Sequence, residues 1–490
     1  MTDSTGASSH AVSTEEVRRY GAYVAGRWQA AQSGQEFETR DPATGAVVAV
    51  VAQGDAADID GAVLNSKEAQ VAWWAVLPSE RGRILGRIAT ALRDDLERLA
   101  TIETRDNGKP LAQARNDVET AARYFEFYAG LADKIHGDTI PLGDGLVSYT
   151  RREPYGVVGV IIPWNAPINQ AARSIAPALV SGNSVVAKPA EQTPLTCLEL
   201  AEIATRCGLP SGVLNVVPGF GETAGSALVE HSLVGKVVFT GSVETGRIVA
   251  ATAGERLKPV TLELGGKSAN IIFEDADIGQ AVRGAVIAIN ANSGQVCSAG
   301  SRLLVHESIH DTVIEQLTKA YATLTVGSGT DDLIMGPLTS EEQLNKVRSY
   351  LSLAKEEGAR VITGGANELP TTGWFTQPVI LTGVTNNMHV AREEIFGPVL
   401  SVIPFQDDDE AVRIANDSDY GLVAGVWTQN LARAHRVASL LEVGQVFVNE
   451  YFAGGVETPF GGYKNSGYGR EKGVEAIHDY TRIKTVTIKL

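Results

Sequence analysis

Residues 155–167 read YGVVGVIIPWNAP, an apolar run that ends in a proline-bracketed turn and leads into a helical pattern. Similar apolar runs follow it, separated by helix-like segments such as Pro194–Cys207. They read SVVAK (184–188), VLNVV (213–217) and KVVFT (236–240). Continuous apolar strands that alternate with helices are typical of a parallel sheet covered on both faces. The sequence therefore predicts a doubly wound α/β sheet in this region.

A second series of strand patterns starts near Val260 and predicts another α/β lobe. Its members read VTLEL (260–264), ANIIF (269–273), SRLLVHE (301–307), VLSVIPF (399–405) and QVFVNE (445–450). Nearer the N-terminus, apolar residues at helical spacing over Pro78–Lys109 predict one long amphipathic helix, with Ser79 as N-cap and Asn107-Gly108 as the stop. The last residues, 482–490, alternate like an exposed strand, whose edge either a partner subunit or the chain itself covers.

Composition excludes several classes of protein. The chain has 490 residues, enough for about three lobes, and its formal net charge is -16, the wrong sign for binding a phosphate backbone. Residues 1–14 lack the pattern of a secretion signal and predict a frayed tail, and the apolar runs are far shorter than the roughly 20 residues of a membrane span. We expect a cytoplasmic protein with neither nucleic acid nor membrane as a partner.

Three cysteines, Cys197, Cys207 and Cys297, form neither a disulfide framework nor a metal-ligand spacing, so no metal is expected. Cys297 stands out because its segment NSGQVCS (292–298) contains a glycine that can expose the thiol. A nucleophilic cysteine needs a nearby base or positive dipole, and an isolated cysteine is more often structural. Both interpretations of Cys297 stay open at this point.

Two other residues are candidates for catalysis. Glu263 ends an apolar run at a Gly-Gly turn, where partial burial raises a carboxyl pKa and favours a general base, although such residues are often salt-bridged. Asn165 follows the first strand of the series, where ligands bind α/β sheets, and its amide could donate to an oxyanion or cap the next helix.

Several polar and glycine-rich turns favour a nucleotide ligand. Lys188 and Glu191 end the second strand, where an ammonium and a carboxylate can bind phosphate and ribose hydroxyls, or form a surface ion pair. The turns GFGETAG (219–225) and FTGSVETG (239–246) each follow a strand, and neither is the usual dinucleotide fingerprint. Their succession in one α/β region is stronger evidence than either turn alone.

Together these motifs resemble the NAD(P)-dependent aldehyde dehydrogenase superfamily, from Tyr23 to the terminal strand. In chain order they are PWNAP, KPAEQTP, FTGSVETG, LELGGKS, NSGQVCSAGSR, EEIFGP and PFGGYKNSGYGRE. The resemblance implies an aldehyde dehydrogenase-like α/β fold with a Rossmann-type cofactor domain, a second α/β catalytic domain and a small β-rich oligomerisation arm, assembled as a homodimer or homotetramer. The implied boundaries are 1–136 and 154–262 for the cofactor domain, 263–445 for the catalytic domain, and 137–153 with 481–490 for the arm, while 446–480 return to the cofactor and substrate region.

The resemblance also implies a mechanism. Cys297 attacks the aldehyde carbon, and the Asn165 amide and the Cys297 backbone N–H hold the oxyanion. Hydride transfer to the nicotinamide leaves a thioester, which Glu263 hydrolyses by activating water. The product is a carboxylic acid.

The cofactor implied by the resemblance is NAD. Lys188 and Glu191 are expected at the adenosine ribose, Ser242 at the pyrophosphate and Glu394 at the nicotinamide ribose. The Glu191 carboxylate repels a 2′-phosphate, so NADP is less favoured. The other cofactor-binding residues expected are Ile161, Trp164, Gly221, Phe239, Thr240, Gly241, Thr245, Gly246, Leu264 and Phe396.

The expected substrate tunnel departs from that of simple-aldehyde enzymes of the family. The residues expected to line it are Ala166, Gln170, Arg173, Ala291, Gly454 and Phe460. Small residues stand at frequent aromatic positions, which predicts a wide tunnel and a bulky, aromatic or branched aldehyde. Arg173 either grips the anionic tail of a semialdehyde or turns outward to pair with a local acid.

Three other functions compete with this one. A CoA-acylating enzyme of the same fold commonly lacks the hydrolytic carboxylate, so the presence of Glu263 argues against it. A non-catalytic protein that retains the fold has no need of Cys297, Glu263 and Asn165 together. A thiol esterase would hydrolyse activated esters without NAD.

Overall fold

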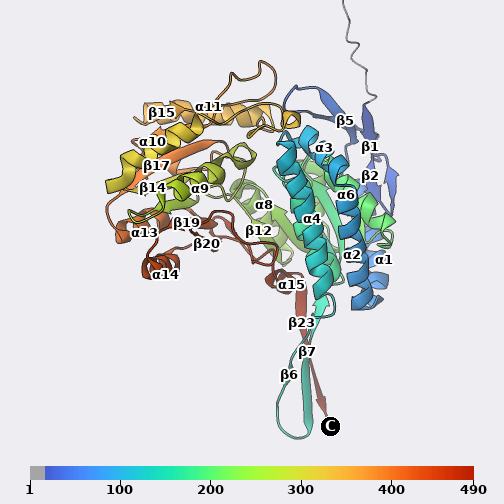
Figure 1. Ribbon diagram of the computed structural model, residues 1–490. Helices are drawn as coiled ribbons and strands as arrows, with labels where there is room; N and C mark the ends of the chain where they lie inside the picture. The colour runs from blue at the N-terminus through green and yellow to red at the C-terminus, as the bar shows by residue number, and fades with distance from the viewer. Residues whose placement is uncertain (1–16) are drawn as a thin grey trace, which may run out of the picture.

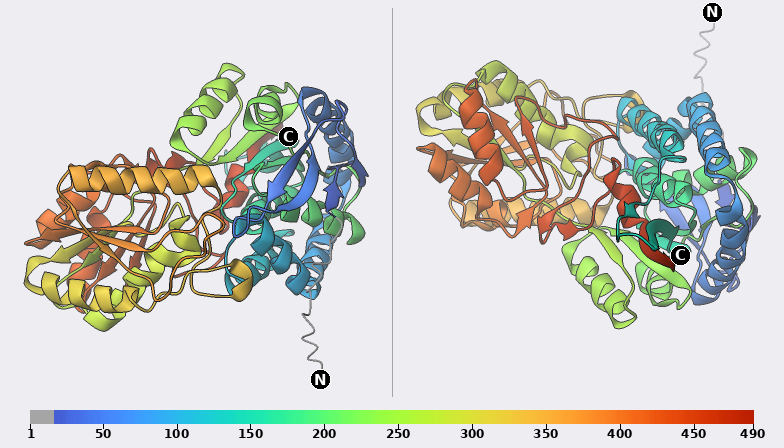
Figure 2. Two further views of the ribbon diagram at one scale, coloured as in Figure 1. Left: turned by 90° about the horizontal axis from the view of Figure 1, so that it is seen from above. Right: turned by 90° about the horizontal axis from the view of Figure 1, so that it is seen from below.

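The computed structural model describes residues 17–490, so the tail predicted for residues 1–14 lies outside the described residues. Two large sheets with their helices lie side by side, and a narrow sheet of three strands projects from the body (Figure 1). Seen from above and below, the lobe coloured blue to green and the lobe coloured yellow to red meet along one boundary (Figure 2). The predicted α/β fold class is confirmed.

The first sheet has the strand order β22-β12-β11-β8-β9-β10-β2-β3, and its run from β12 to β10 is parallel. The strands are β2 (Ala22–Val24), β3 (Arg27–Gln29), β8 (Val157–Ile162), β9 (Ser184–Pro189), β10 (Leu214–Val216), β11 (Val234–Thr240), β12 (Val260–Glu263) and β22 (Gly467–Tyr468). Alternate residues enter different cores: Val158 and Val160 pack on one face, and Val157 on the other. Burial on both faces explains the continuous apolar runs.

Helices cover both faces of this sheet. One face packs against α1 (Ala56–Ala75), α7 (Ser226–Glu230) and α8 (Val243–Glu255). The other packs against α2 (Pro78–Asp94), α3 (Leu96–Asn107), α4 (Leu111–Leu131), α5 (Pro167–Val180), α6 (Leu195–Arg206) and α15 (Glu475–Asp479). These layers place the C-terminal ends of β8, β9 and β11 next to helix N-termini, where α/β proteins bind ligands.

The single long helix predicted over Pro78–Lys109 is wrong, because the chain breaks at Asp95 into α2 and α3. Asp95 has φ -106° and ψ 15°, and its carboxylate accepts from the Arg98 guanidinium. The apolar spacing continues across this one-residue break, so periodicity alone does not reveal it. Ser79 is not the N-cap either, since α2 begins at Pro78, whose missing N–H suits a first helical position. The predicted stop at Gly108 is confirmed, with φ 94°.

The second sheet has the order β15-β16-β17-β14-β13-β19-β20, parallel except for β15. Its strands are β13 (Ala269–Ile272), β14 (Arg302–His306), β15 (Arg360–Thr363), β16 (Val379–Thr382), β17 (Val399–Phe405), β19 (Val423–Trp427) and β20 (Gln445–Val448). The expectation that this series starts near Val260 is wrong, since β12 pairs with β11 of the first sheet, Thr240 opposite Glu263. That pairing places Glu263 beside the turn that follows β11.

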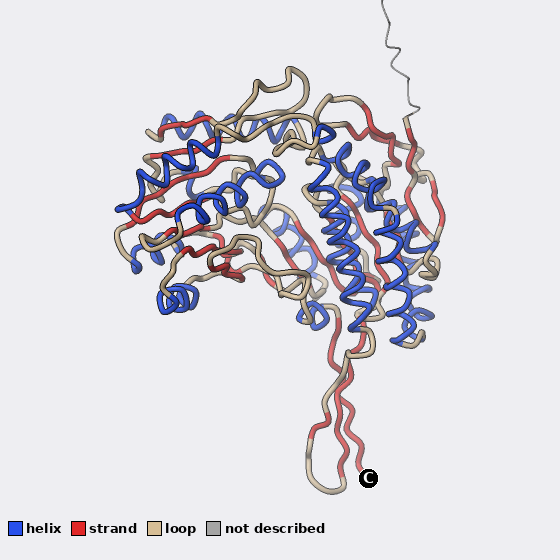
Figure 3. The backbone as a smooth tube through the Cα atoms, viewed as in Figure 1, coloured by secondary structure: helices blue, strands red, loops and turns tan. Residues whose placement is uncertain are grey.

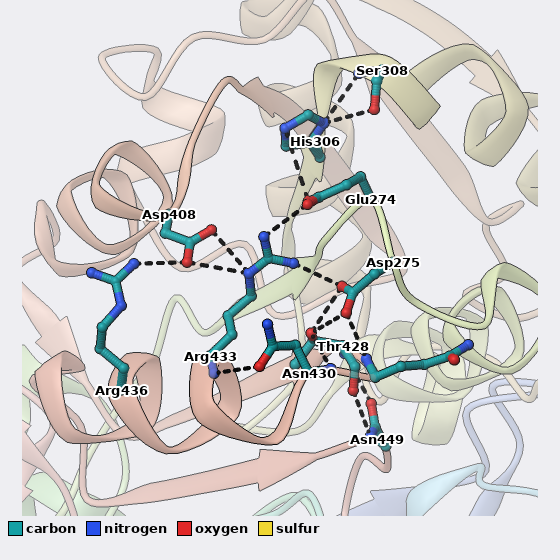
Figure 4. Close-up of polar contacts among 11 residues, drawn as sticks. Glu274, Asp275, His306, Ser308, Asp408, Thr428, Asn430, Arg433, Arg436 and Asn449 are labelled. Carbon is teal, nitrogen blue, oxygen red and sulfur yellow. Dashed lines mark hydrogen bonds and ion pairs between the residues drawn. The ribbon is translucent and has the colours of Figure 1, made fainter.

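Helices also cover both faces of the second sheet. On one face lie α9 (Ile278–Asn290) and α10 (His310–Tyr321), and on the other α11 (Glu341–Glu356), α12 (His389–Arg392), α13 (Asp408–Asn416) and α14 (Leu431–Leu440). Arg433 of α14 contacts the carboxylates of Glu274, Asp275 and Asp408 at 2.7, 2.8 and 3.0 Å (Figure 4). This cluster fastens the segment after β13 to α13 and α14.

Three smaller sheets complete the chain. Strand β23 (Thr481–Lys489) pairs along its length with β7 (Leu146–Pro154), which also pairs with β6 (Thr139–Ile140). Figure 3 shows these strands leaving the body together. The second small sheet has the order β1 (Arg18–Tyr20), β5 (Val47–Ala52), β4 (Glu36–Arg40). The third pairs β18 (Tyr420–Gly421) with β21 (Tyr463–Lys464). Within residues 17–490, no helix is both long and apolar enough to cross a bilayer.

Candidate active site

Cys297 lies in a constrained loop between α9 and β14. Asn292 and Ser293 have φ 47° and 54°, values that cost energy for residues with a side chain. The loop is held from outside, because the Gln295 side-chain oxygen accepts from the Thr339 backbone N–H at 2.9 Å. Cys297 is half-buried and lines a cavity. The local structure thus presents Cys297 on a fixed backbone, as a nucleophile requires.

Asn165 ends the turn after β8 and faces the same loop. Its side-chain amide donates to the Gln295 carbonyl at 2.9 Å, while its own carbonyl accepts from the Asn292 amide at 2.8 Å. The alternative that Asn165 caps the next helix is wrong, since the N-cap of α5 is Ala166 and no side chain caps that end. The structure therefore joins Asn165 to the loop that carries Cys297.

Glu263 ends β12 and is 2% exposed, and neither of its carboxyl oxygens has a hydrogen-bond partner among the described residues. The turn that follows packs against the cysteine loop, because a Cβ added at Gly266 would lie 2.3 Å from the Cys297 carbonyl oxygen. Burial raises the pKa of the Glu263 carboxyl well above its usual range, and the nearby Arg173 charge lowers it only in part. A buried carboxyl with a raised pKa and no hydrogen-bond partner among the described residues is a candidate general base.

Burial also raises the pKa of the Cys297 thiol, to about 12, although the Arg173 charge opposes the rise. The thiol is therefore protonated at neutral pH in this state. Cys197 is fully buried and its thiol pKa is raised as well, while Cys207 lies at the end of α6. Among the cysteines, Cys297 is the one that faces the cavity.

A cavity of about 660 Å³ lies next to Cys297, between α4, α5, α9 and the C-terminal segment. Of the residues predicted from the sequence, it is lined by Asn165, Ala166, Gln170, Arg173, Ala291, Cys297 and Phe460. Gly454 does not line it. The loop around Gly454 folds back on itself, with the Thr458 hydroxyl donating to the Gly455 carbonyl, and Phe452 of the same loop reaches the cavity instead.

Arg173 is buried rather than turned outward. It is 4% exposed and forms an ion pair with Glu471, which is fully buried, and it donates to the Thr240 hydroxyl at 3.2 Å. The Glu471 charge opposes the effect of burial and raises the Arg173 pKa. The interpretation that Arg173 pairs with an acid agrees with this geometry, although its outward orientation is wrong.

The motifs did not indicate the polar side chains that line much of the cavity. These are Lys109, Gln113, Asn116, Asp117, Thr120, Asn290 and Lys472. Several come from α4, where 113, 116, 117, 120 and 124 recur at helical spacing, so periodicity could have found a shared polar face. Asp117 ion-pairs with Lys109 and accepts from the Asn169 amide at 3.0 Å.

Residues expected at the adenosine end of a dinucleotide lie at strand ends of the first sheet. Lys188 is 2% exposed, and its ammonium contacts the Glu191 carboxylate at 2.9 Å. Ser242 caps α8 by accepting from the Thr245 N–H at 3.2 Å, and the free N–H groups of such a helix end suit a pyrophosphate. Leu264 packs on Gly246, where an added Cβ would lie 2.6 Å from its side chain. Ile161, Phe239, Thr240 and Gly241 lie at or just after the ends of β8 and β11, and Gly221 begins a π-helical turn (Gly221–Gly225).

Residues expected at the nicotinamide end come from the second lobe. Glu394 accepts from the Gly266 N–H at 2.9 Å, so it contacts the same turn that packs on Cys297. Phe396 has φ 60°, and its ring meets the Trp164 ring edge-on with centroids 5.2 Å apart. Beside them Lys267 is buried without a hydrogen-bond partner in the described part of the chain, and burial lowers its pKa to about 7. Lys267 stands in the motif LELGGKS, but the motif gave no sign that its amine is buried.

Comparison with known proteins identifies the family of the chain. The model of the aldehyde dehydrogenase family matches residues 28–486. The Bacillus subtilis (strain 168) protein DhaS is 44% identical over 472 residues, which cover 96% of this chain and 95% of DhaS.

Solved structures give the same result. The NAD⁺ complex of an aldehyde dehydrogenase from Bacillus cereus is 42% identical, with a TM-score of 0.94 over 96% of this chain and 97% of that chain. An indole-3-acetaldehyde dehydrogenase in complex with NAD⁺ is also 42% identical, with a TM-score of 0.95 over 97% of this chain and 98% of that chain.

Proposed function

Because the chain belongs to the aldehyde dehydrogenase family and is an enzyme of that class, we propose that it oxidises an aldehyde to a carboxylic acid with NAD. One observation carries this proposal: Cys297 and Asn165 line the same cavity, the glycine turn after Glu263 packs against the Cys297 loop, and the Glu263 charge acts on the Cys297 thiol. A nucleophile, an oxyanion donor and a proton acceptor at one place suit acyl chemistry on a carbonyl group.

The first step is attack of the Cys297 sulfur on the aldehyde carbon, which forms a thiohemiacetal. The Asn165 amide and the Cys297 backbone N–H hold the developing oxyanion. In the resting structure the Asn165 amide donates to the Gln295 carbonyl, so it must exchange that bond for one to the substrate oxygen. Since the thiol pKa is raised to about 12, attack also requires that a base remove the thiol proton.

The residues at the strand ends fit NAD. When bound, NAD accepts the hydride that the thiohemiacetal gives up. Lys188 and Glu191 would hold the adenosine ribose, the helix end at Ser242 the pyrophosphate, and Glu394 the nicotinamide ribose. The Glu191 carboxylate already forms an ion pair with Lys188. A 2′-phosphate would therefore be repelled by Glu191 and would find the Lys188 ammonium already paired. This arrangement favours NAD over NADP.

Glu263 then hydrolyses the thioester. Its buried carboxyl has no competing hydrogen bond among residues 17–490, and its raised pKa makes the ionised carboxylate a stronger base toward water. Hydrolysis releases the acid and restores the thiol. A retained Glu263 in this position disfavours transfer of the acyl group to CoA.

The substrate proposed here is larger than acetaldehyde. Ala166 and Ala291 leave a cavity of about 660 Å³, the size of a pocket for a bulky ligand. For the assembly, we propose a homodimer or homotetramer built with the arm of residues 137–153 and 481–490. Its support is the exposed apolar side chains of β23, Ile483 at 61% and Ile488 at 46%.

Turnover with a panel of aldehydes tests the proposed function. Purified protein is mixed with NAD or NADP and aliphatic, aromatic and carboxylated aldehydes, and NADH and the acid are quantified. The expected result is equimolar NADH and acid, with NAD preferred and benzaldehyde-sized substrates preferred to acetaldehyde. Acyl-CoA as the product, or ester hydrolysis without any aldehyde oxidation, would contradict the proposal.

A further inference from the structure

Lys472 carries the one positive charge among the cavity-lining residues that has no acidic partner in the described part of the chain. Its side chain lines the cavity that holds Cys297, together with Arg173 and Lys109. Its ammonium lies 5.7 Å from the centroid of the Phe460 ring. A ring face offers a cation only weak attraction and no hydrogen bond.

The other two cations of the cavity are neutralised. Arg173 pairs with the buried Glu471, and Lys109 contacts the carboxylates of Glu103 and Asp117. Asp117 is therefore already paired with a cation, and it also accepts a hydrogen bond from the Asn169 side-chain amide. Since these charges cancel within the wall, the charge of Lys472 is the one left for a ligand.

None of the acidic groups that act on Lys472 forms an ion pair with it in the described part of the chain. The charged groups that act on it are Arg173 of α5, Glu457 of the preceding loop and Glu263 of β12. Glu457 forms its ion pair with Arg123, and the Glu263 carboxyl is buried with a raised pKa. Burial, with repulsion from Arg173, lowers the pKa of Lys472 to about 8.

The backbone fixes this lysine at the cavity. Lys472 has φ 62°, an unfavourable conformation for a residue with a side chain, and such strain occurs where the surroundings or the function require it. The adjacent Glu471 is anchored by Arg173 and by the Ser174 hydroxyl at 2.6 Å. Lys472 is therefore held next to a rigid, buried neighbour.

We propose that Lys472 binds an oxyanion group on the aldehyde, so that the preferred substrate carries a carboxylate at the end remote from the carbonyl. This inference rests on the proposed aldehyde oxidation and names its substrate class. A carboxylate would give the Lys472 ammonium a charge-assisted hydrogen bond in a partly buried site, where such bonds are strong. The substrate carboxylate would thus be the acidic partner of Lys472, which has none among the described residues.

Matched substrates and matched variants test the proposal. The value of kcat/KM at pH 7 is measured for aldehydes with a terminal carboxylate, at several chain lengths, and for their methyl esters. We expect the wild type to prefer the acid at least tenfold at its best chain length, Lys472→Met to lose that preference, and Lys472→Arg to keep most of it. The control is Lys319→Met, an exposed lysine on α10 paired with Glu315. An acid-to-ester ratio that is unchanged in Lys472→Met would overturn the proposal.

The pH dependence provides a second readout. The acid-to-ester ratio of the wild type should fall as pH rises from 7 to 9, because Lys472 loses its proton in that range, whereas Lys472→Arg should hold its ratio. Steps common to both substrates cancel in this ratio. A wild-type ratio that is constant over this range would contradict a lysine with a lowered pKa as the binding group.

A binding experiment separates failure of this inference from failure of the proposed function. Succinate, glutarate and adipate, which resemble oxidised products, are titrated by calorimetry into wild-type protein and into Lys472→Met, each with NAD. We expect at least tenfold weaker binding of the best dicarboxylate to Lys472→Met. Equal binding, or none to the wild type, would overturn the role of Lys472 even if the protein oxidised no aldehyde at all.

Discussion

Arg173 and Glu471 form a buried ion pair that joins helix α5 to the segment before α15, nearly 300 residues later in the chain. Both side chains are at most 5% exposed. Ser174 donates to the same carboxylate, and Arg173 also contacts Thr240 at the end of β11. The pair thus holds the wall of the cavity to the C-terminal segment that carries Lys472.

Replacing Arg173 with Met should destabilise the protein, because it leaves the Glu471 carboxylate buried without its cation. Breaking a buried pair on one side costs about 3–5 kcal/mol. The measurement is the free energy of unfolding in urea, and the double variant Arg173→Met/Glu471→Gln should recover part of the loss. A normal stability, with only kcat/KM for carboxylated aldehydes reduced, would instead make Arg173 the group that binds the anion.

The raised thiol pKa of Cys297 predicts its alkylation kinetics. Since burial raises that pKa to about 12, the thiolate fraction in the protein without NAD should grow about tenfold per pH unit from 7 to 9. The rate at which iodoacetamide modifies Cys297, followed by peptide mass spectrometry, should rise accordingly. A rate that levels off below pH 8 would show that the thiol is already ionised at rest.

Replacing Glu263 with Gln should separate the two halves of the reaction. We expect a burst of about one NADH per active site, followed by steady turnover reduced at least a hundredfold, because hydrolysis of the thioester loses its general base. Rapid-mixing absorbance measures both phases. If the variant shows neither a burst nor turnover while still binding NAD, Glu263 acts before hydride transfer.

Glu191 should control the choice between NAD and NADP. Glu191→Ala removes the carboxylate that contacts Lys188, so the ammonium becomes available to a 2′-phosphate. The ratio of kcat/KM for NADP to that for NAD should rise at least tenfold, with Glu80→Ala, an exposed acid of α2, as the control. An unchanged ratio would mean that Glu191 does not face the ribose.

Lys267 should affect stability with a defined pH dependence. Burial lowers its pKa to about 7 in the folded protein, against about 10.4 when unfolded, so the unfolded chain binds the additional proton between these values. Stability should therefore rise with pH over this window, by up to about 1.4 kcal/mol per unit. Lys267→Met should lack this rise and be more stable at pH 7 by about 2–4 kcal/mol. Urea unfolding at pH 7, 8 and 9 gives both quantities, and an equal slope in the variant would contradict the burial of a neutral amine.

Much of the fold could be predicted from local patterns. Strands such as β8 and β9 are buried on both faces, so their apolar runs are unmistakable, and Gly108 ends its helix because it adopts a left-handed conformation. The break at Asp95 could not be predicted, because one non-helical residue leaves the apolar spacing in phase. Nor could spacing show that β12 belongs to the first sheet, since strand pairing depends on partners distant in sequence.

In the candidate site, too, local segments could be predicted from the sequence, whereas contacts between distant segments could not. Cys297, Asn165 and the glycine turn after Glu263 lie in recognisable segments, and the structure brings these segments together. The partner of Arg173 could not be predicted, because Glu471 comes from a distant part of the chain. Lys472 has no motif of its own, and its significance appears only when the other charges of the cavity are paired.

The most direct test of the central claim is the mass of the enzyme during turnover. Glu263→Gln is mixed with NAD and an oxidised aldehyde from the panel, quenched in acid and measured intact and after digestion. The account predicts a gain equal to the aldehyde less two hydrogen atoms, located on the peptide that contains Cys297, and no gain without NAD or in Cys297→Ala. NADH formed without this adduct, or an adduct on another residue, would contradict it.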